Sequence, residues 1–147
     1  GGFTGLRISI AAGQAIAEVA SAVVIAVPAA LVAAGSTPGM AARTGVVIVC
    51  AAAKGGTVWC SRLTRVTIDE PWRILGTPGI VDRLAGDAEP SAILADEHVD
   101  PALLEELRRS GVPIDPPVFH ASVLADIAMQ GGPDVQVLDD PAMLLPL

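Results

Sequence analysis

The sequence predicts an α/β fold with a mainly parallel or mixed sheet, flanking helices and a buried, Ala/Val-rich N-terminal half. Strand-like and helix-like segments alternate in the last third of the chain, which is typical of parallel α/β sheets. Short β-branched runs such as Val46–Val49 suit strands buried on both faces. Charge is also unevenly distributed. Of nine Lys and Arg and 16 Asp and Glu, the first 60 residues hold only Arg7, Glu18, Arg43 and Lys54.

The N-terminal segment is expected to begin with a strand. Leu6–Ile10 alternates in polarity, as a half-buried strand does. Ala12–Ala22 then forms either a helix or the second strand of a hairpin that turns at Ala12-Gly13. Val23–Val27 is continuous and β-branched, so we expect a buried strand, which Pro28 ends.

The tripeptide Thr-Pro-Gly occurs at 37–39 and again at 77–79, each time followed by an arginine, Arg43 or Arg83. Thr at the N-cap and Pro at the first helical position predict a short helix after each, the second over Thr77–Ala85. Two such helices would be consistent with an internal duplication. Because these residues open helices for purely local reasons, we favour two independent occurrences.

The middle of the chain is expected to be β structure. Val46–Val49 predicts a buried strand, and Lys54-Gly55-Gly56 predicts the turn that follows it. Thr57–Ser61 and Leu63–Ile68 read as two further strands.

The last third carries the clearest signals. Ala92–Ala95 predicts a strand, and Asp100 with Pro101 predicts the start of a helix that Gly111 ends. A second helix is expected over Ala121–Gln130 and a strand over Val135–Leu138. The chain is therefore expected to be one domain over 1–147, with a possible sub-boundary at 86–91 between an apolar N-terminal part and an acidic βαβ-like C-terminal part.

Composition excludes some classes of function. The net charge of −7 argues against nucleic acid as a partner, since phosphates require basic patches. The uncharged run Val19–Ala34 is shorter than the ~20 residues that cross a bilayer, so a membrane partner is not expected. An alternative is a membrane-attached protein with residues 15–35 inserted. We expect a cytoplasmic protein; Cys50 is expected to be a buried thiol, with a Cys50–Cys60 bridge as the alternative.

Acidic residues follow two of the predicted strands. Asp96, Glu97 and His98 come after Ala92–Ala95, and Asp139-Asp140 follows Val135–Leu138. If these strands are parallel neighbours, their carboxyl ends meet at one edge, where ligands of α/β sheets bind. Carboxylates gathered there suit Mg²⁺, so the predicted metal ligands are Asp96, Asp139 and Asp140, and the predicted catalytic residues are Asp96, His98 and Asp139. The alternative is that these acids cap helices and form turns.

The order of Ala92–Asp96, a helix at 101–110 and Val135–Asp140 resembles that of the PIN-like, Mg²⁺-dependent nuclease domains. The resemblance covers a third of the chain and implies a first strand ending in Asp and a later strand ending in an acidic pair. It gives an alternative function, a Mg²⁺-dependent hydrolase or nuclease-like enzyme that uses Asp96 and Asp139. The acidic surface argues against a nuclease.

A second candidate site lies at Lys54, Gly55 and Gly56. Glycines after a buried strand can point backbone N–H groups at a phosphate, and Lys54 adds positive charge, so these residues are predicted to bind a phosphate-bearing cofactor. The spacing is not that of the nucleotide-binding loop GxxxxGK[ST], and an ordinary hairpin turn explains it equally.

The function that these patterns favour is that of a subunit in a homo- or hetero-oligomeric assembly. Nearly uncharged surface is rarely left in water, so the first 60 residues are expected to be buried by the chain itself, by a second copy or by another protein. The strand ends are expected to bind a small ligand.

Overall fold

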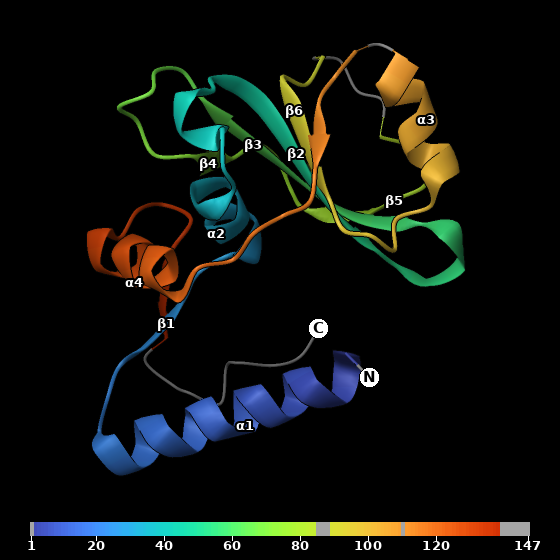
Figure 1. Cartoon of the computed structure of the whole chain (residues 1–147). Helices are drawn as coiled ribbons and strands as arrows, with labels where there is room; N and C mark the ends of the chain where they lie inside the picture. The colour runs from blue at the N-terminus through green and yellow to red at the C-terminus, as the bar shows by residue number, and fades with distance from the viewer. Residues whose placement is uncertain (1, 85–88, 110, 139–147) are drawn as a thin grey trace. The chain divides into compact units, whose positions relative to one another are not determined.

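The computed structural model describes residues 2–84, 89–109 and 111–138, and contacts divide the chain into two compact units (Figure 1). The smaller unit comprises Gly1–Val27 with Ile127–Leu147, and the larger unit is Pro28–Asp126. The predicted sub-boundary at 86–91 falls inside the larger unit. The organisation as a single domain stays a prediction.

The smaller unit contains one long helix and a two-stranded sheet. Helix α1 is Gly2–Ala20, and strand β1 (Val24–Ala26) pairs antiparallel with β8 (Gln136–Leu138). The predicted strand at Leu6–Ile10 is therefore wrong. These five alternating residues lie within a continuous run of helix, and the Ala-rich residues after them favour helix strongly enough to override the local alternation.

Strand β1 is correctly located but is not buried on both faces. Ile25 is 40% exposed, and the strand pairs with β8 in a sheet of two strands. Its β-branched residues therefore reflect the preference of a strand for such side chains more than burial.

The larger unit is built on a mixed sheet with the strand order β4-β3-β2-β6-β7, and β5 also pairs with β3. Strand β2 is parallel to β6, β6 is parallel to β7, and the pairs of β3 are antiparallel. The strands are β2 (Gly45–Ala52), β3 (Val58–Arg65), β4 (Arg73–Ile74), β5 (Gly79–Val81), β6 (Ala92–Ala95) and β7 (Ile114–Asp115). The predicted α/β fold with a mixed sheet is confirmed, although one strand, β3, replaces the two predicted at 57–68.

Helical segments lie before, between and after these strands in the described part of the chain, and the last of them, α4, spans the division between the two units. They are α2 (Ala29–Ser36), the 3-10 turns η1 (Met40–Ala42) and η2 (Lys54–Gly56), α3 (Pro101–Arg109) and α4 (Ala121–Gln130). The predictions of helices from Pro101 and over Ala121–Gln130 are confirmed. At the start of α3, the Asp100 carboxylate accepts a hydrogen bond of 2.8 Å from the Ala102 N–H, which is the expected N-cap.

The two Thr-Pro-Gly segments adopt different structures. Thr37 ends α2, and its hydroxyl donates 2.8 Å back to the Ala33 carbonyl, while Gly39 (φ 84°) precedes η1. The second segment leads into strand β5, so the predicted helix at Thr77–Ala85 is wrong. The two segments therefore do not form a structural repeat.

The sheet of the larger unit has a helix on each face (Figure 1). Because side chains alternate along a strand, Ile48 and Cys50 of β2 face one side, and Val47 and Val49 face the other. Helix α3 closes the first side, and α2 packs against β2 and β3 on the second. The residues that form the core on the α3 side are Ile48, Cys50, Val58, Leu84, Ile93, Ala95, Val99 and Leu104.

This core accounts for much of the uncharged N-terminal half. Residues 30–34 of α2 are buried, as are Val47, Ile48 and Cys50 of β2. Residues 15–35 are divided among α1, β1 and α2, so they do not form a single inserted helix. Among the described residues, no helix is long and apolar enough to span a bilayer. The end of α1 differs from α2, since Val19 is 90% exposed.

Arg65 at the end of β3 is a buried cation whose partners are backbone carbonyls. Its guanidinium donates to the carbonyls of Met40 and Ala41 at 2.6 Å each and to that of Arg43 at 2.6 Å. It also lies 4.5 Å from the centre of the Trp72 ring. Arg65 is only 8% exposed, and these bonds hold η1 against the end of β3. They give donors to the Ala41 and Arg43 carbonyls and a second donor to the Met40 carbonyl, which also accepts from the Arg43 N–H.

Replacing Arg65 with Met should therefore lower the free energy of unfolding by about 3 kcal/mol, because three hydrogen bonds from the guanidinium to backbone carbonyls are lost. Urea denaturation followed by circular dichroism measures this loss. Arg73→Met, an exposed arginine on β4, is the matched control and should cost well under about 1 kcal/mol. Equal losses for the two variants would contradict the anchoring role of Arg65.

Candidate functional site

The carboxyl ends of three parallel strands meet at one edge of the larger sheet. Strand β2 ends at Ala52, β6 ends at Ala95 and β7 ends at Asp115. The pairs Cys50↔Ala95 and Leu94↔Asp115 place these ends side by side. This is the edge at which open α/β sheets bind ligands, and it is where the sequence places Asp96.

Asp96 joins two of these strand ends. One carboxylate oxygen, Oδ2, accepts 3.0 Å from the N–H of Ala52, and the other, Oδ1, accepts 2.8 Å from the N–H of His98. The first bond continues the pairing of β2 with β6 by one step beyond the backbone ladder. Asp96 is half-buried, so it holds the edge together while keeping part of its carboxylate accessible.

A cavity of about 340 Å³ opens beside Asp96 on the α2 face of the sheet. Val49, Ala51, Trp59 and Ser61 share this face because they alternate with Cys50 and Cys60 along β2 and β3. The residues that line the cavity are Pro28, Ala29, Ala30, Val49, Cys50, Ala51, Trp59, Ser61, Pro78, Asp96, Pro117 and Phe119. An apolar wall with a few polar groups is typical of a small-molecule site.

The segment that carries Pro117 and Phe119 is held against the end of α2. The Thr37 hydroxyl accepts 3.0 Å from the N–H of Val118, and the Ser36 hydroxyl accepts 3.0 Å from the N–H of His120. The two bonds bracket Phe119, so one wall of the cavity is fixed by side chains more than 80 positions earlier in the chain.

His98, which was also predicted at this edge, does not line the cavity. The His98 ring is exposed, with Nε2 3.7 Å from Glu97 Oε1 at the surface. Asp139 and Asp140 lie outside the described residues. The expectation that their strand neighbours β6 is wrong, because β8 pairs with β1 in a different sheet.

This strand pairing also departs from the arrangement that the nuclease resemblance implies. Among the described residues, no three His, Cys, Asp or Glu side chains gather as a metal site. The metal and catalytic roles of Asp96, His98, Asp139 and Asp140 stay predictions.

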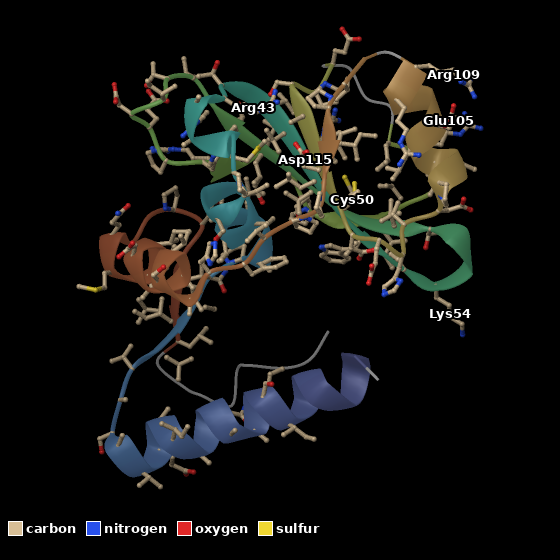
Figure 2. All side chains as sticks on the ribbon, viewed as in Figure 1. Arg43, Cys50, Lys54, Glu105, Arg109 and Asp115 are labelled. Carbon is tan, nitrogen blue, oxygen red and sulfur yellow. The ribbon has the colours of Figure 1, made fainter. Side chains whose placement is uncertain are left out.

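Lys54, Gly55 and Gly56 form the tip of the β2–β3 hairpin, where Lys54 extends away from the sheet (Figure 2). Gly55 and Gly56 have φ of 73° and 76°, which favour glycine, and the Thr57 hydroxyl donates 2.8 Å to the Lys54 carbonyl. The turn alternative accounts for these features, and a phosphate-binding role stays a prediction.

Three residues at this edge were not predicted as site residues from the sequence. Asp115, at the end of the two-residue strand β7, lies on the same edge as Asp96, and both line a second hollow of about 240 Å³. Trp59 and Phe119 lie on the cavity wall. The one sequence signal for Trp59 and Phe119 is that the chain has only four aromatic residues. Their exposure at the cavity is visible only in the structure.

Cys50 and Cys60 lie directly opposite each other on β2 and β3, both as free thiols. The hydrogen bond between the two thiols, together with burial, raises the pKa of Cys50 far above its ordinary value. The same hydrogen bond lowers the pKa of Cys60, against the opposing effect of burial. Cys60 is therefore the more acidic thiol of the pair.

These features define a mixed α/β protein with an apolar cavity at the carboxyl edge of its sheet. No family model and no curated protein sequence matches the chain. Solved structures do match it. YeaZ from Pseudomonas aeruginosa aligns with 100% of this chain and 69% of its own length, with a TM-score of 0.68 and 19% identity.

A second crystal structure, that of an uncharacterized protein with similarity to peptidase YEAZ from Pseudomonas aeruginosa, covers 100% of this chain and 68% of its own. Its TM-score is 0.66 and its identity is 18%. At these identities the likeness shows the fold: this chain has a YeaZ-like α/β fold.

The two cysteines should differ in reactivity. At a pH of about 8, iodoacetamide should modify Cys60 first, because its lowered pKa gives more thiolate, whereas Cys50 should resist until the chain unfolds. Peptide mass spectrometry after timed labelling measures both. Labelling in urea is the control and should modify the two equally. Faster modification of Cys50 in the folded chain would contradict this assignment.

Proposed function

We propose that this chain is a subunit of a protein assembly, that helix α1 supplies its contact surface, and that the cavity beside Asp96 binds a small ligand. The observation that carries the first part is the exposure of α1. Ile8 is 64% exposed, Ile16 is 67% exposed and Val19 is 90% exposed.

Helix α1 has two faces, and both are apolar. Ile10, Gly13 and Ala17 are buried or half-buried, and their spacing places them on one side of the helix. Ile8, Ala12, Ala15, Ile16 and Val19 follow the same spacing on another side, and all five are exposed. A surface helix normally carries charge on its outer face, whereas α1 has two charged residues in its sequence, Arg7 and Glu18. A helix that is apolar on both sides is typically covered on both.

The outer face is also shaped for close contact. Ala12 and Ala15 are small, so another helix can approach the backbone of α1 between the larger side chains of Ile8 and Ile16. This supports a helix of a second copy or of another protein as the occupant, and self or another subunit is the partner predicted from the sequence.

The remaining uncharged segments need no partner. Helix α2 and strand β2 are buried by the larger unit itself. The sequence predicted a contact surface somewhere in the first 60 residues, and the proposal restricts it to α1. The ligand-binding part of the proposal is supported separately by the cavity at the strand ends, which needs no residue of α1.

Native mass spectrometry of the purified chain should find it with a second copy or a co-purifying protein. Ile16→Lys and Val19→Lys should release a monomer, because each places an ammonium group in an apolar contact. Val66→Lys is the matched control, since Val66 is 78% exposed on the larger unit, and it should leave the complex intact.

Circular dichroism checks that each variant keeps its helix content. A wild-type chain that stays monomeric over the whole concentration range would reject the assembly role.

A further inference from the structure

We propose that the cavity beside Asp96 binds a small organic cation, an amine carried on a planar ring. This names the ligand class of the proposed ligand site and therefore rests on it. The inference comes from three features of the cavity: its aromatic rim, its carboxylate, and the Ser61 hydroxyl.

The rim presents two aromatic side chains to a ligand. Trp59 is 43% exposed and Phe119 is 57% exposed, and both line the cavity. Between them the wall is made by small apolar residues and by Pro28, Pro78 and Pro117, which have no long side chains to fill the space. A planar ring can stack on such aromatic faces, and a cation beside it is attracted by their electron-rich surfaces.

The Asp96 carboxylate gives the cavity its charge. Each of its oxygens accepts one backbone hydrogen bond and keeps capacity for a second. Among the residues that the structure describes, no Lys, Arg or His forms an ion pair with it. A half-buried carboxylate in an apolar wall gains most from a cationic ligand, since water and salt screen the pair less there.

Ser61 adds a second polar group. It is 5% exposed as a residue and lines the cavity. Its hydroxyl can donate one hydrogen bond to a ligand and accept others from it. Ser61 and Asp96 both lie on the α2 face of the sheet, so one ligand can reach both.

The same features disfavour an anionic ligand such as a phosphate. In the described lining of the cavity no side chain is cationic, and Lys54 lies at the hairpin tip instead. The net charge of −7 further concentrates cations near the protein and repels anions.

The test uses three probes of similar size: 2-phenylethylamine, 2-phenylethanol and 3-phenylpropionate. Two-dimensional NMR of the labelled wild-type protein follows the indole N–H of Trp59, and Trp72, which is 9% exposed, is the internal control. The amine should bind with a dissociation constant on the order of 1 mM, the alcohol should bind about fivefold more weakly, and the carboxylate should not bind.

Matched variants separate the carboxylate from the overall charge. Asp96→Asn should weaken binding of the amine about fivefold and leave binding of the alcohol nearly unchanged. Glu97→Gln also removes one negative charge, at a residue next to Asp96 that does not line the cavity. It should therefore leave binding of both the amine and the alcohol unchanged. Phe119→Ala should weaken both, and because Phe119 is exposed this variant keeps the fold. If Asp96→Asn fails to fold, the three probes on the wild-type protein still decide the charge preference.

The outcomes distinguish the inference from the proposed ligand site. If none of the probes shifts Trp59 at concentrations up to roughly 10 mM, the ligand site and the inference both fail. If all three bind alike, and Asp96→Asn changes nothing, the cavity is a ligand site but the cation preference is wrong.

Discussion

The pairing of β2 with β6 is the constraint on which the larger unit depends. Strand β2 is antiparallel to β3 on one side and parallel to β6 on the other, so it brings the hairpin and the βα part of the chain into one sheet. The backbone ladder of this pair ends at Cys50 and Ala95, and the Asp96 carboxylate then takes the Ala52 N–H. The Asp96 side chain therefore extends the sheet at the point where the cavity opens. The same carboxylate stabilises the fold and, in the proposed function, contacts the ligand.

Whether a residue of the uncharged N-terminal half is buried depends on the helix or strand to which it belongs. Helix α2 and strand β2 are interior because a sheet covered on both faces needs apolar residues on both. Arg65 holds η1 against the end of β3 by donating hydrogen bonds to three backbone carbonyls. These carbonyls act as partners of the buried guanidinium in place of a carboxylate. In α1, by contrast, Ile8, Ile16 and Val19 are exposed, and these residues belong to the proposed contact surface.

Much of the larger unit could be predicted because its signals are local. The cap at Asp100, the turn at Gly55-Gly56 and the β-branched runs each specify one element within a few residues. The sequence predictions were wrong where residues outside the local segment determine the structure. Leu6–Ile10 belongs to a helix that continues through the Ala-rich residues after it. The strand at 136–138 has β1, far away in the sequence, as its partner, and no local pattern shows this. Asp96 was found because it follows a clear strand, whereas Phe119 is placed by Ser36 and Thr37, and no local pattern reveals that contact.

The most direct test of this account is the hydrogen exchange of the Ala52 amide, measured by NMR. If the Asp96 carboxylate completes the sheet, this amide should exchange at least about tenfold more slowly than that of Lys54, two residues further along the hairpin. Asp96→Ala, which removes both acceptor oxygens, should abolish the difference while the amides in the middle of β2 stay protected. An Ala52 amide that exchanges as fast as that of Lys54 in the wild-type chain would contradict the role assigned to Asp96.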